Sequence, residues 1–212
     1  MPEQETRPVP LPTKKHVVGA AAAVATALDG KVPYALVGGA ACSALGSPRV
    51  TEEDIEIVVP KGRTSEARSL LKEHPESFDI EAKTLHTYFK NGESSRVRVE
   101  LLAPPGMFRE DFTEDTPTIR VHDDRIRVLK PTLLLNAKCG SVQNRPNQER
   151  MQSDAMDIVF LLSWCHRNGL YPTADEVPNA TRALVDTFTS LVPSKEHWIN
   201  SGYDMKQGRF LN

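Results

Sequence analysis

The sequence has almost no surplus of charge of either sign. Its 212 residues include 26 Lys and Arg against 28 Asp and Glu, which gives a formal net charge of -2. Long nucleic acids are held mainly by basic side chains that neutralise their phosphates. Because the chain has no general excess of basic residues, we do not expect long DNA or RNA among its partners.

Several common catalytic and metal-binding motifs are absent as well. The three cysteines, Cys42, Cys139 and Cys165, are odd in number and contain no CxxC pair, so they predict neither a disulfide framework nor a zinc site. We expect them to be buried, reduced thiols of an intracellular protein. The sequence also lacks the GxxxxGK[ST], GxGxxG, HExxH and GxSxG patterns. The P-loop, dinucleotide-binding, zinc-protease and serine-hydrolase interpretations therefore have no support.

No apolar run is long enough to cross a membrane. The most apolar early stretch, Val17 to Leu28, has 12 residues, whereas a spanning helix needs about 20. No basic stretch followed by an apolar segment marks a secretory signal. Residues 1–13 contain four prolines among charged residues and are expected to form an extended leader. We expect a cytoplasmic protein without a membrane partner.

The predicted secondary structure changes in type twice along the chain. The first part predicts alternating helices (14–28, 40–45, 64–73) and strands (34–37, 55–59), and the middle predicts short strands at 78–80, 84–89, 97–102, 118–121 and 125–128. After Pro131 the pattern becomes helical, with segments at about 131–139, 148–165 and 174–191, the last interrupted near Pro178. Residues 193–212 show no usable period. This order predicts an α/β (α+β) fold. We expect a core over 14–130, a helical subdomain over 131–192 and a tail over 193–212.

Three acidic residues stand out against this background. Asp54 and Glu56 lie two apart at the start of a strand, so their side chains leave the same face while Ile55 and Ile57 point into the core. Glu100 lies inside another apolar strand, where an acid is costly unless it is paired. If the two strands are neighbours, the three carboxylates form one cluster that can hold two divalent metal ions. The alternative is that all three lie on solvated strand faces.

A glycine pair and two polar residues lie close to these acids in the sequence. Gly38 and Gly39 follow a buried strand and open a helix, where the backbone can approach a ligand and the first amides attract phosphate. Arg49 and Thr51, which lie between the glycines and the acids, can donate to phosphate oxygens. Taken singly, the glycines are equally typical of a tight turn, and an arginine of a surface charge.

Together, these residues resemble the DNA polymerase β-like nucleotidyltransferase superfamily. The similar pattern runs from Gly38-Gly39-Ala40-Ala41 through Arg49-Val50-Thr51 to Asp54-Ile55-Glu56, with Glu100 on a later strand. It looks most like small stand-alone members of the MNT/AbiEii type, including fungal ones. Downstream the resemblance includes Leu129-Lys130-Pro131, Lys138, Arg150, Asp154 and Asp157-Ile158.

The resemblance implies a nucleotidyltransferase-type mixed sheet with flanking helices, followed by a C-terminal helical subdomain. It implies transfer of NMP from an NTP to a hydroxyl of a small molecule or a protein. Asp54, Glu56 and Glu100 would be the catalytic and metal-binding acids, with two Mg²⁺ ions (or Mn²⁺) as cofactor and Glu100 also as the base. Gly38, Gly39, Arg49, Thr51, Lys138 and Arg150 would contact the nucleotide, and Asp154 and Asp157 could pair with these two helical cations.

The sequence also departs from the family pattern. The second acid is Glu56 where Asp is commoner, the third is Glu100, and the segment between Gly39 and Asp54 is slightly long, with a bulge expected at Glu52-Glu53. These departures leave open a catalytically inactive nucleotidyltransferase fold that serves in binding or regulation. A plain α/β protein with solvated acids is the third alternative.

Overall fold

A mixed seven-stranded sheet lies at the centre of the computed structural model, which describes residues 12–49, 54–92, 95–143, 145 and 147–211. The strands follow the order β3-β4-β5-β2-β1-β7-β6 across the sheet. Their bounds are β1 (Ala35–Val37), β2 (Asp54–Val58), β3 (Phe78–Ile80), β4 (Thr87–Asn91), β5 (Ser95–Leu102), β6 (Thr118–Val121) and β7 (Ile126–Leu129). Every strand predicted from the sequence is present, with ends that differ by a few residues.

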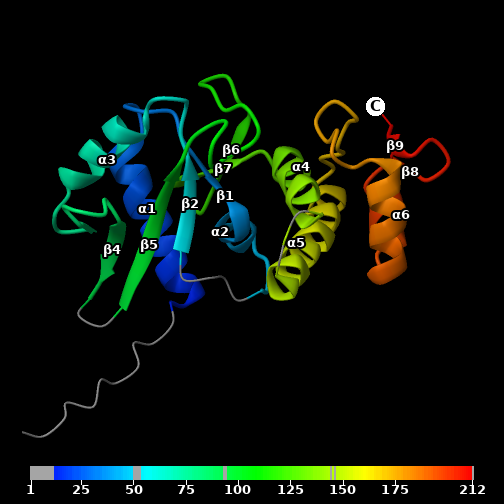
Figure 1. The fold of residues 1–212 in the computed structure, drawn as a ribbon, viewed down its shortest axis with the longest axis horizontal. Coiled ribbons are helices and arrows are strands. Elements are labelled where there is room, and N and C mark those ends of the chain that lie inside the picture. Colours follow the sequence, from blue (N-terminus) through cyan, green and yellow to red (C-terminus); the bar gives the residue numbers. More distant parts are fainter. Residues whose placement is uncertain (1–11, 50–53, 93–94, 144, 146, 212) are drawn as a thin grey trace, which may run out of the picture.

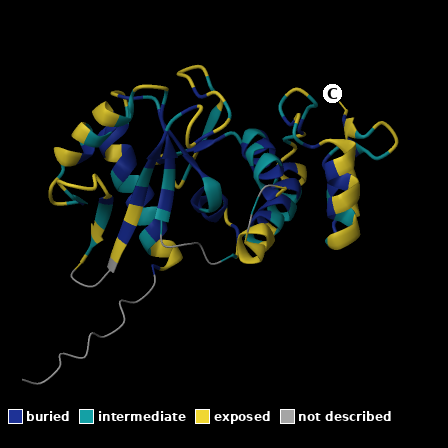
Figure 2. Cartoon of the chain, viewed as in Figure 1, coloured by how far each residue is buried: buried dark blue, intermediate teal, exposed yellow. Residues whose placement is uncertain are grey.

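Two strand pairs in this sheet are parallel. β2 pairs with β5, and β1 pairs with β7, whereas the other neighbours are antiparallel. Side chains alternate between a buried and a more exposed face along β2 and β5 (Figure 2). On β2, Ile55 and Ile57 are buried while Asp54 and Glu56 are only partly covered, as the period of two predicts.

Helices surround the sheet. α1 and α3 contact its strands, α2 contacts β1, β2 and α5, and α4 packs against α5. Figure 1 shows α1 and α3 at one end of the view and α4, α5 and α6 at the other. The bounds are α1 (Lys14–Leu28), α2 (Gly38–Ala44), α3 (Thr64–Lys72), α4 (Pro131–Val142), α5 (Gln148–Arg167), α6 (Arg182–Leu191) and α7 (Lys195–Asn200).

Helix α1 forms over the residues for which the sequence predicts a helix. It spans the predicted residues Lys14–Leu28 and buries Val17, Val24 and Leu28 along one face, which fits the helical repeat. Its alanine content favours the helix, and Gly30 has a φ of 72° just beyond the end. Glycine reaches this left-handed conformation without steric cost, so the chain can turn away towards β1.

The C-terminal quarter differs from the sequence prediction. The sequence predicts a helix over 174–191 with an interruption near Pro178, but α6 begins only at Arg182. The Thr181 side chain accepts a hydrogen bond from the Leu184 N–H (3.2 Å). Asn179 is held instead by Asn136 of α4, whose Oδ1 accepts from the Asn179 N–H at 2.9 Å. The prediction was wrong for residues 174–181 because this contact between distant segments, and a capping threonine, fix where the helix starts.

The last residues also form regular structure. α7 is followed by a short hairpin of β8 (Tyr203–Asp204) and β9 (Arg209–Phe210). Trp198 of α7 is 0% exposed and packs against the rings of Tyr203 and Phe210, with centroid distances of 5.4 and 6.0 Å. These elements are too short to give a periodic signal, so packing of aromatic side chains defines them.

Two further expectations can be compared with the structure. Cys42, Cys139 and Cys165 are all buried and form no disulfide, which confirms the prediction of free thiols. In the part of the chain that the structure describes, no helix has both the length and the apolar character needed to cross a membrane.

Candidate functional site

The strand register brings the predicted acids together. β2 and β5 are parallel neighbours, and the residue opposite Glu56 is Glu100. Asp54 lies two residues before Glu56 and is opposite Arg98. Because alternate residues of a strand share a face, all three acids are on the same side of the sheet. The condition that the sequence left open, that the two strands be neighbours, is met.

The glycine pair gives room to two charged side chains. Gly38 has a φ of 65°, and a Cβ atom at this position would overlap Glu56 Oε2. A Cβ atom on Gly39 would overlap the guanidinium of Arg49 at Nη2. Gly38 therefore meets both a conformational and a steric demand, whereas the demand at Gly39 is steric. The side chains of Glu56 and Arg49 occupy the space beside the two glycines.

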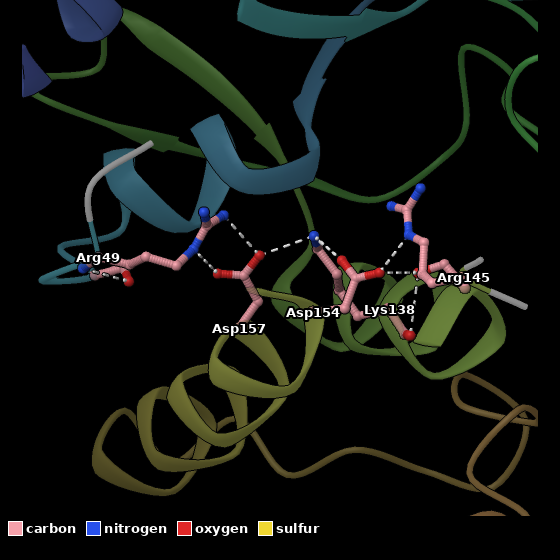
Figure 3. Close-up of polar contacts among 7 residues, drawn as sticks. Arg49, Lys138, Arg145, Asp154 and Asp157 are labelled. Atoms are coloured by element: carbon pink, nitrogen blue, oxygen red, sulfur yellow. Dashed lines mark hydrogen bonds and ion pairs between the residues drawn. The ribbon is translucent and has the colours of Figure 1, made fainter. Parts of the chain in front are cut away.

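Five side chains form a chain of alternating charges between the core and the helical half (Figure 3). Arg49, from the loop after α2, donates to both carboxylate oxygens of Asp157 at 3.0 Å. Lys138 of α4 contacts Asp157 at 2.8 Å and Asp154 at 2.7 Å. Arg145 then donates to the other oxygen of Asp154 at 2.7 Å. We call these five residues the ion chain.

The ion chain is largely withdrawn from water. Asp157 is 0% exposed, and Lys138 is also buried. Burial alone would lower the pKa of Lys138, but Asp157 and Asp154 outweigh it and raise the pKa. Burial would raise the pKa of Asp154, but Lys138 and Arg145 outweigh it and lower the pKa. Both shifts favour the charged forms, so each pair compensates for the cost of desolvation.

A cavity of about 230 Å³ lies between the acids and the ion chain. The acids Asp54, Glu56 and Glu100 form part of its lining. Its cationic lining is contributed by Arg49, Arg98, Lys138, Arg145 and Arg150. A wall with so many guanidinium groups suits phosphate oxygens, which arginine binds through paired hydrogen bonds.

Glu56 has an unfavourable electrostatic environment in this cavity. Burial raises the pKa of its carboxyl group, Lys138 acts in the opposite direction, and the carboxylates of Asp54 and Glu100 raise the pKa further. The net shift is upward. A carboxylate in this position becomes more stable as an anion when further positive charge is brought close to it.

The donor set can be tested against a divalent metal ion. Mg²⁺ prefers oxygen ligands, and Asp54, Glu56 and Glu100 supply carboxylate oxygens to one cavity. Within the described ranges, no group of three or more His, Cys, Asp or Glu side chains is arranged so as to hold a metal ion. Glu100 contacts Arg98 at 2.9 Å. The carboxylate oxygens are of the type that a hard cation prefers, but the described acids are not arranged around one metal position, so metal binding by these acids stays a prediction.

The other residues predicted to bind nucleotide differ in where the structure places them. Arg150 lines the cavity from α5 and is exposed. Lys138 pairs with both Asp154 and Asp157. Thr51 and the bulge expected at Glu52-Glu53 lie outside the described residues. A role in nucleotide binding stays a prediction for Arg49, Lys138, Arg150, Gly38 and Gly39.

Sequence reasoning missed two cations of the site. Arg145 lies between α4 and α5, where the sequence has no helical period, and Arg98 is a strand residue beside Glu100. Arg98 could have been found from its position two residues before Glu100 on the same strand face. Arg145 had no such signal, because its partner Asp154 is fixed by the packing of α4 on α5.

The sheet order, the acids on two parallel strands and the helical half beside them define a nucleotidyltransferase-type fold. Among solved structures, the chain is similar to an antigenic nucleotidyltransferase-like protein from Paracoccidioides brasiliensis, with 19% identity and a TM-score of 0.66. That alignment covers 96% of this chain and 97% of the other. It is also similar to JHP933 from Helicobacter pylori, with 15% identity, 92% and 89% of the two chains covered and a TM-score of 0.54.

These similarities establish the fold, and they confirm the nucleotidyltransferase-type mixed sheet that the sequence resemblance implied. No protein-family model matches the sequence, and a search of curated proteins gives no match. A shared fold does not determine the reaction, which depends on the residues of the site.

Proposed function

We propose that this protein is a nucleotidyltransferase that moves NMP from an NTP to a hydroxyl group of a small molecule or a protein. The observation that carries the proposal is the placement of Glu56 opposite Glu100 on parallel strands, with Asp54 beside them, in a cavity walled by arginines. Carboxylate oxygens are suitable ligands for a hard metal ion, and guanidinium groups are suitable donors to phosphate oxygens.

Asp54 and Glu56 are the residues proposed to hold Mg²⁺, with Mn²⁺ as a substitute, and Glu100 completes the set. When bound, the metal ions would neutralise phosphate charge and polarise the α-phosphate. Glu100 accepts the proton of the acceptor hydroxyl, whose oxygen then attacks the α-phosphorus. The bond between the α-phosphorus and the bridging oxygen breaks, and pyrophosphate leaves with that oxygen.

The cations and the glycine turn are proposed to position the triphosphate. Arg150 and Arg98 line the cavity on the helical and sheet sides, so they can bind phosphate oxygens between them. Lys138 is fixed by two carboxylates and contributes a stationary positive charge. Arg49 lies against Gly39, and Gly38 and Thr51 complete the predicted set. Such preorganised charges stabilise the transition state without reorganisation during the reaction.

A second candidate function is a nucleotidyltransferase fold that binds nucleotide without turnover. Two observations favour it: Glu100 contacts Arg98 at 2.9 Å, and no three acids of the described chain are arranged around a metal position. If Glu100 stays with Arg98 in the presence of NTP, the acceptor hydroxyl has no base.

The test separates binding from transfer. Purified protein is mixed with each NTP labelled at the α-phosphate, with Mg²⁺ or Mn²⁺, and with small-molecule and protein fractions of a cell extract. The proposal expects label in one fraction together with free pyrophosphate, and loss of both in Asp54→Ala. Asp79→Ala is the matched control, because Asp79 is an acid of the same sheet that pairs with Arg96 on β5 and does not line the cavity.

Calorimetry with NTP and metal then distinguishes the two candidates. NTP binding without transfer supports the non-catalytic candidate. If no NTP binds in the presence of either metal ion, both are wrong.

A further inference from the structure

A second cavity shares a wall with the first. It has a volume of about 250 Å³ and lies between helix α4 and the segment that follows β5. Glu56, Lys138 and Arg145 line both cavities. The two spaces therefore meet at one of the proposed metal-binding carboxylates and at two members of the ion chain.

The two cavities differ in chemical character. The first is lined almost entirely by charged side chains, with Ala40 as its sole residue with an apolar side chain among the described residues. The second also has charged and polar lining residues, Arg109, Glu110 and Ser141 beside the three shared ones, but it adds the hydrocarbon side chains of Val37, Leu102, Met107, Phe108, Leu134 and Ala137. Met107 is 67% exposed, so part of this apolar wall contacts solvent. Covering such surface with an apolar group is favourable.

We propose that the second cavity is the acceptor compartment, and that it binds a small alcohol whose reactive hydroxyl is attached to a hydrocarbon or ring face. This inference rests on the proposed function. A triphosphate matches the cationic first cavity, whereas an apolar face has no complementary surface there. A hydroxyl group on a molecule in the second cavity faces the first cavity across Glu56. The proposed position of the α-phosphate is in the first cavity.

The volume and the lining of the second cavity indicate which acceptors it can hold. Ligand pockets for drug-sized molecules have volumes of about 300–1,000 Å³, so a cavity of about 250 Å³ suits a molecule with one ring. The aromatic residue of the wall, Phe108, is only 7% exposed. Val37, Leu102 and Leu134 are buried as well, so Met107 is the most exposed apolar residue of the wall. The described lining thus presents no exposed aromatic ring on which a nucleobase could stack, which favours the acceptor over the nucleoside.

The methyl group of Met107 provides a direct readout. The protein is labelled with ¹³C at its methionine methyl groups and titrated with benzyl alcohol, with myo-inositol as a hydroxyl-rich compound that lacks a hydrocarbon face. Benzyl alcohol is expected to shift the Met107 signal in a saturable way at roughly millimolar concentration. The signals of Met151 and Met156, which are also exposed but do not line the cavity, should stay in place.

Two variants test the location. Ala137→Phe places a ring in the cavity wall and is expected to weaken the benzyl alcohol response by about tenfold. Ala183→Phe, at an exposed position of α6, should leave it unchanged. The unshifted Met151 and Met156 signals of each variant check that it is folded. Equal shifts with myo-inositol, or no saturable Met107 shift in the wild-type protein, would overturn the proposal.

A competition step distinguishes this inference from the proposed function. ATP with Mg²⁺ should bind together with benzyl alcohol, without displacing it. Displacement would assign the second cavity to the nucleoside and overturn the acceptor assignment while the proposed function stands. If none of the NTPs binds with Mg²⁺ or Mn²⁺ while the alcohol response is intact, the proposed function is rejected and the alcohol site has no acceptor role.

Discussion

Arg49 and Asp157 form a two-bond ion pair that joins the loop before β2 to helix α5. Both bonds measure 3.0 Å, and the pair is 108 residues apart in the sequence. Gly39 lies directly beside the guanidinium group, so its missing side chain is what gives the arginine room. The pair therefore connects the sheet half and the helical half at the edge of the candidate site.

Asp157→Asn should destabilise the protein strongly. The substitution leaves Arg49 and Lys138 without a shared anion in a buried position, and breaking such a pair costs about 3–5 kcal/mol. Urea denaturation measures the change. The matched control is Asp79→Asn, which removes an exposed pair with Arg96 and should cost about 0–1 kcal/mol. Similar losses for both variants would show that burial does not strengthen the Arg49–Asp157 pair.

Gly39→Ala should act through Arg49. The new methyl group overlaps the guanidinium, which must then leave Asp157 or push the turn aside. In the Arg49→Ala background the same substitution should cost much less, and the double-mutant cycle should give a coupling energy of about 0.5–3 kcal/mol. Unfolding free energies of the four proteins test this. Additive losses would mean that Gly39 is needed for another reason.

Glu56→Gln should stabilise the metal-free protein at neutral pH. The pKa of Glu56 is raised above its ordinary value of 4.5 in the folded state, so the folded protein binds more protons than the unfolded chain between the two values. The contribution of Glu56 to stability therefore falls as pH rises from 4.5 through the raised pKa, and stays low above it. Because a glutamine side chain does not ionise, the Glu56→Gln variant does not lose this stability as the pH rises.

The measurement is thermal unfolding in buffer with a chelator across the acid-to-neutral range. The melting temperature of Glu56→Gln should exceed that of the wild-type protein at neutral pH, and the difference should shrink below pH 4.5. A variant less stable than the wild-type protein at neutral pH contradicts the argument.

Trp198→Ala should cost about 3–5 kcal/mol, because it removes a fully buried ring and leaves a cavity. Trp198 contacts Phe188 of α6 as well as the hairpin rings, with a centroid distance of 6.0 Å. Its neighbour Ile199 is 48% exposed, so Ile199→Ala should stay within about 0.5 kcal/mol. Guanidinium denaturation of both variants measures the difference. A small effect of Trp198→Ala would mean that α7 and the hairpin add little to the stability of the chain.

The parts of the fold with strong local signals could be predicted from the sequence. The alanine-rich stretch marks α1, and the alternation of acids with Ile55 and Ile57 places Asp54 and Glu56 on one face of β2. From the sequence, Glu100 joins the other two acids only if its strand lies next to β2. Strand pairing could not be predicted, because it depends on contacts between distant parts of the chain. The structure meets that condition.

What could not be predicted depends on long-range packing. Asp157 is bound by Arg49 and Lys138 from two other segments. The family resemblance named Lys138 as a possible partner, but no pattern in the sequence pairs Asp157 with Arg49, which lies 108 residues away. The start of α6 depends on Asn136, which holds Asn179 across 43 residues. The hairpin at Tyr203 is too short for a pattern, so its packing on Trp198 becomes visible only in three dimensions.

The ion chain has an odd number of members, with three cations and two anions. Each anion is shared by two cations, whereas Arg49 and Arg145 stand at the ends. Loss of any one cation leaves two cations and two anions, whereas loss of either aspartate leaves three cations with a single anion. The two aspartates, rather than the three cations, are therefore the members whose loss leaves uncompensated charge in this buried position.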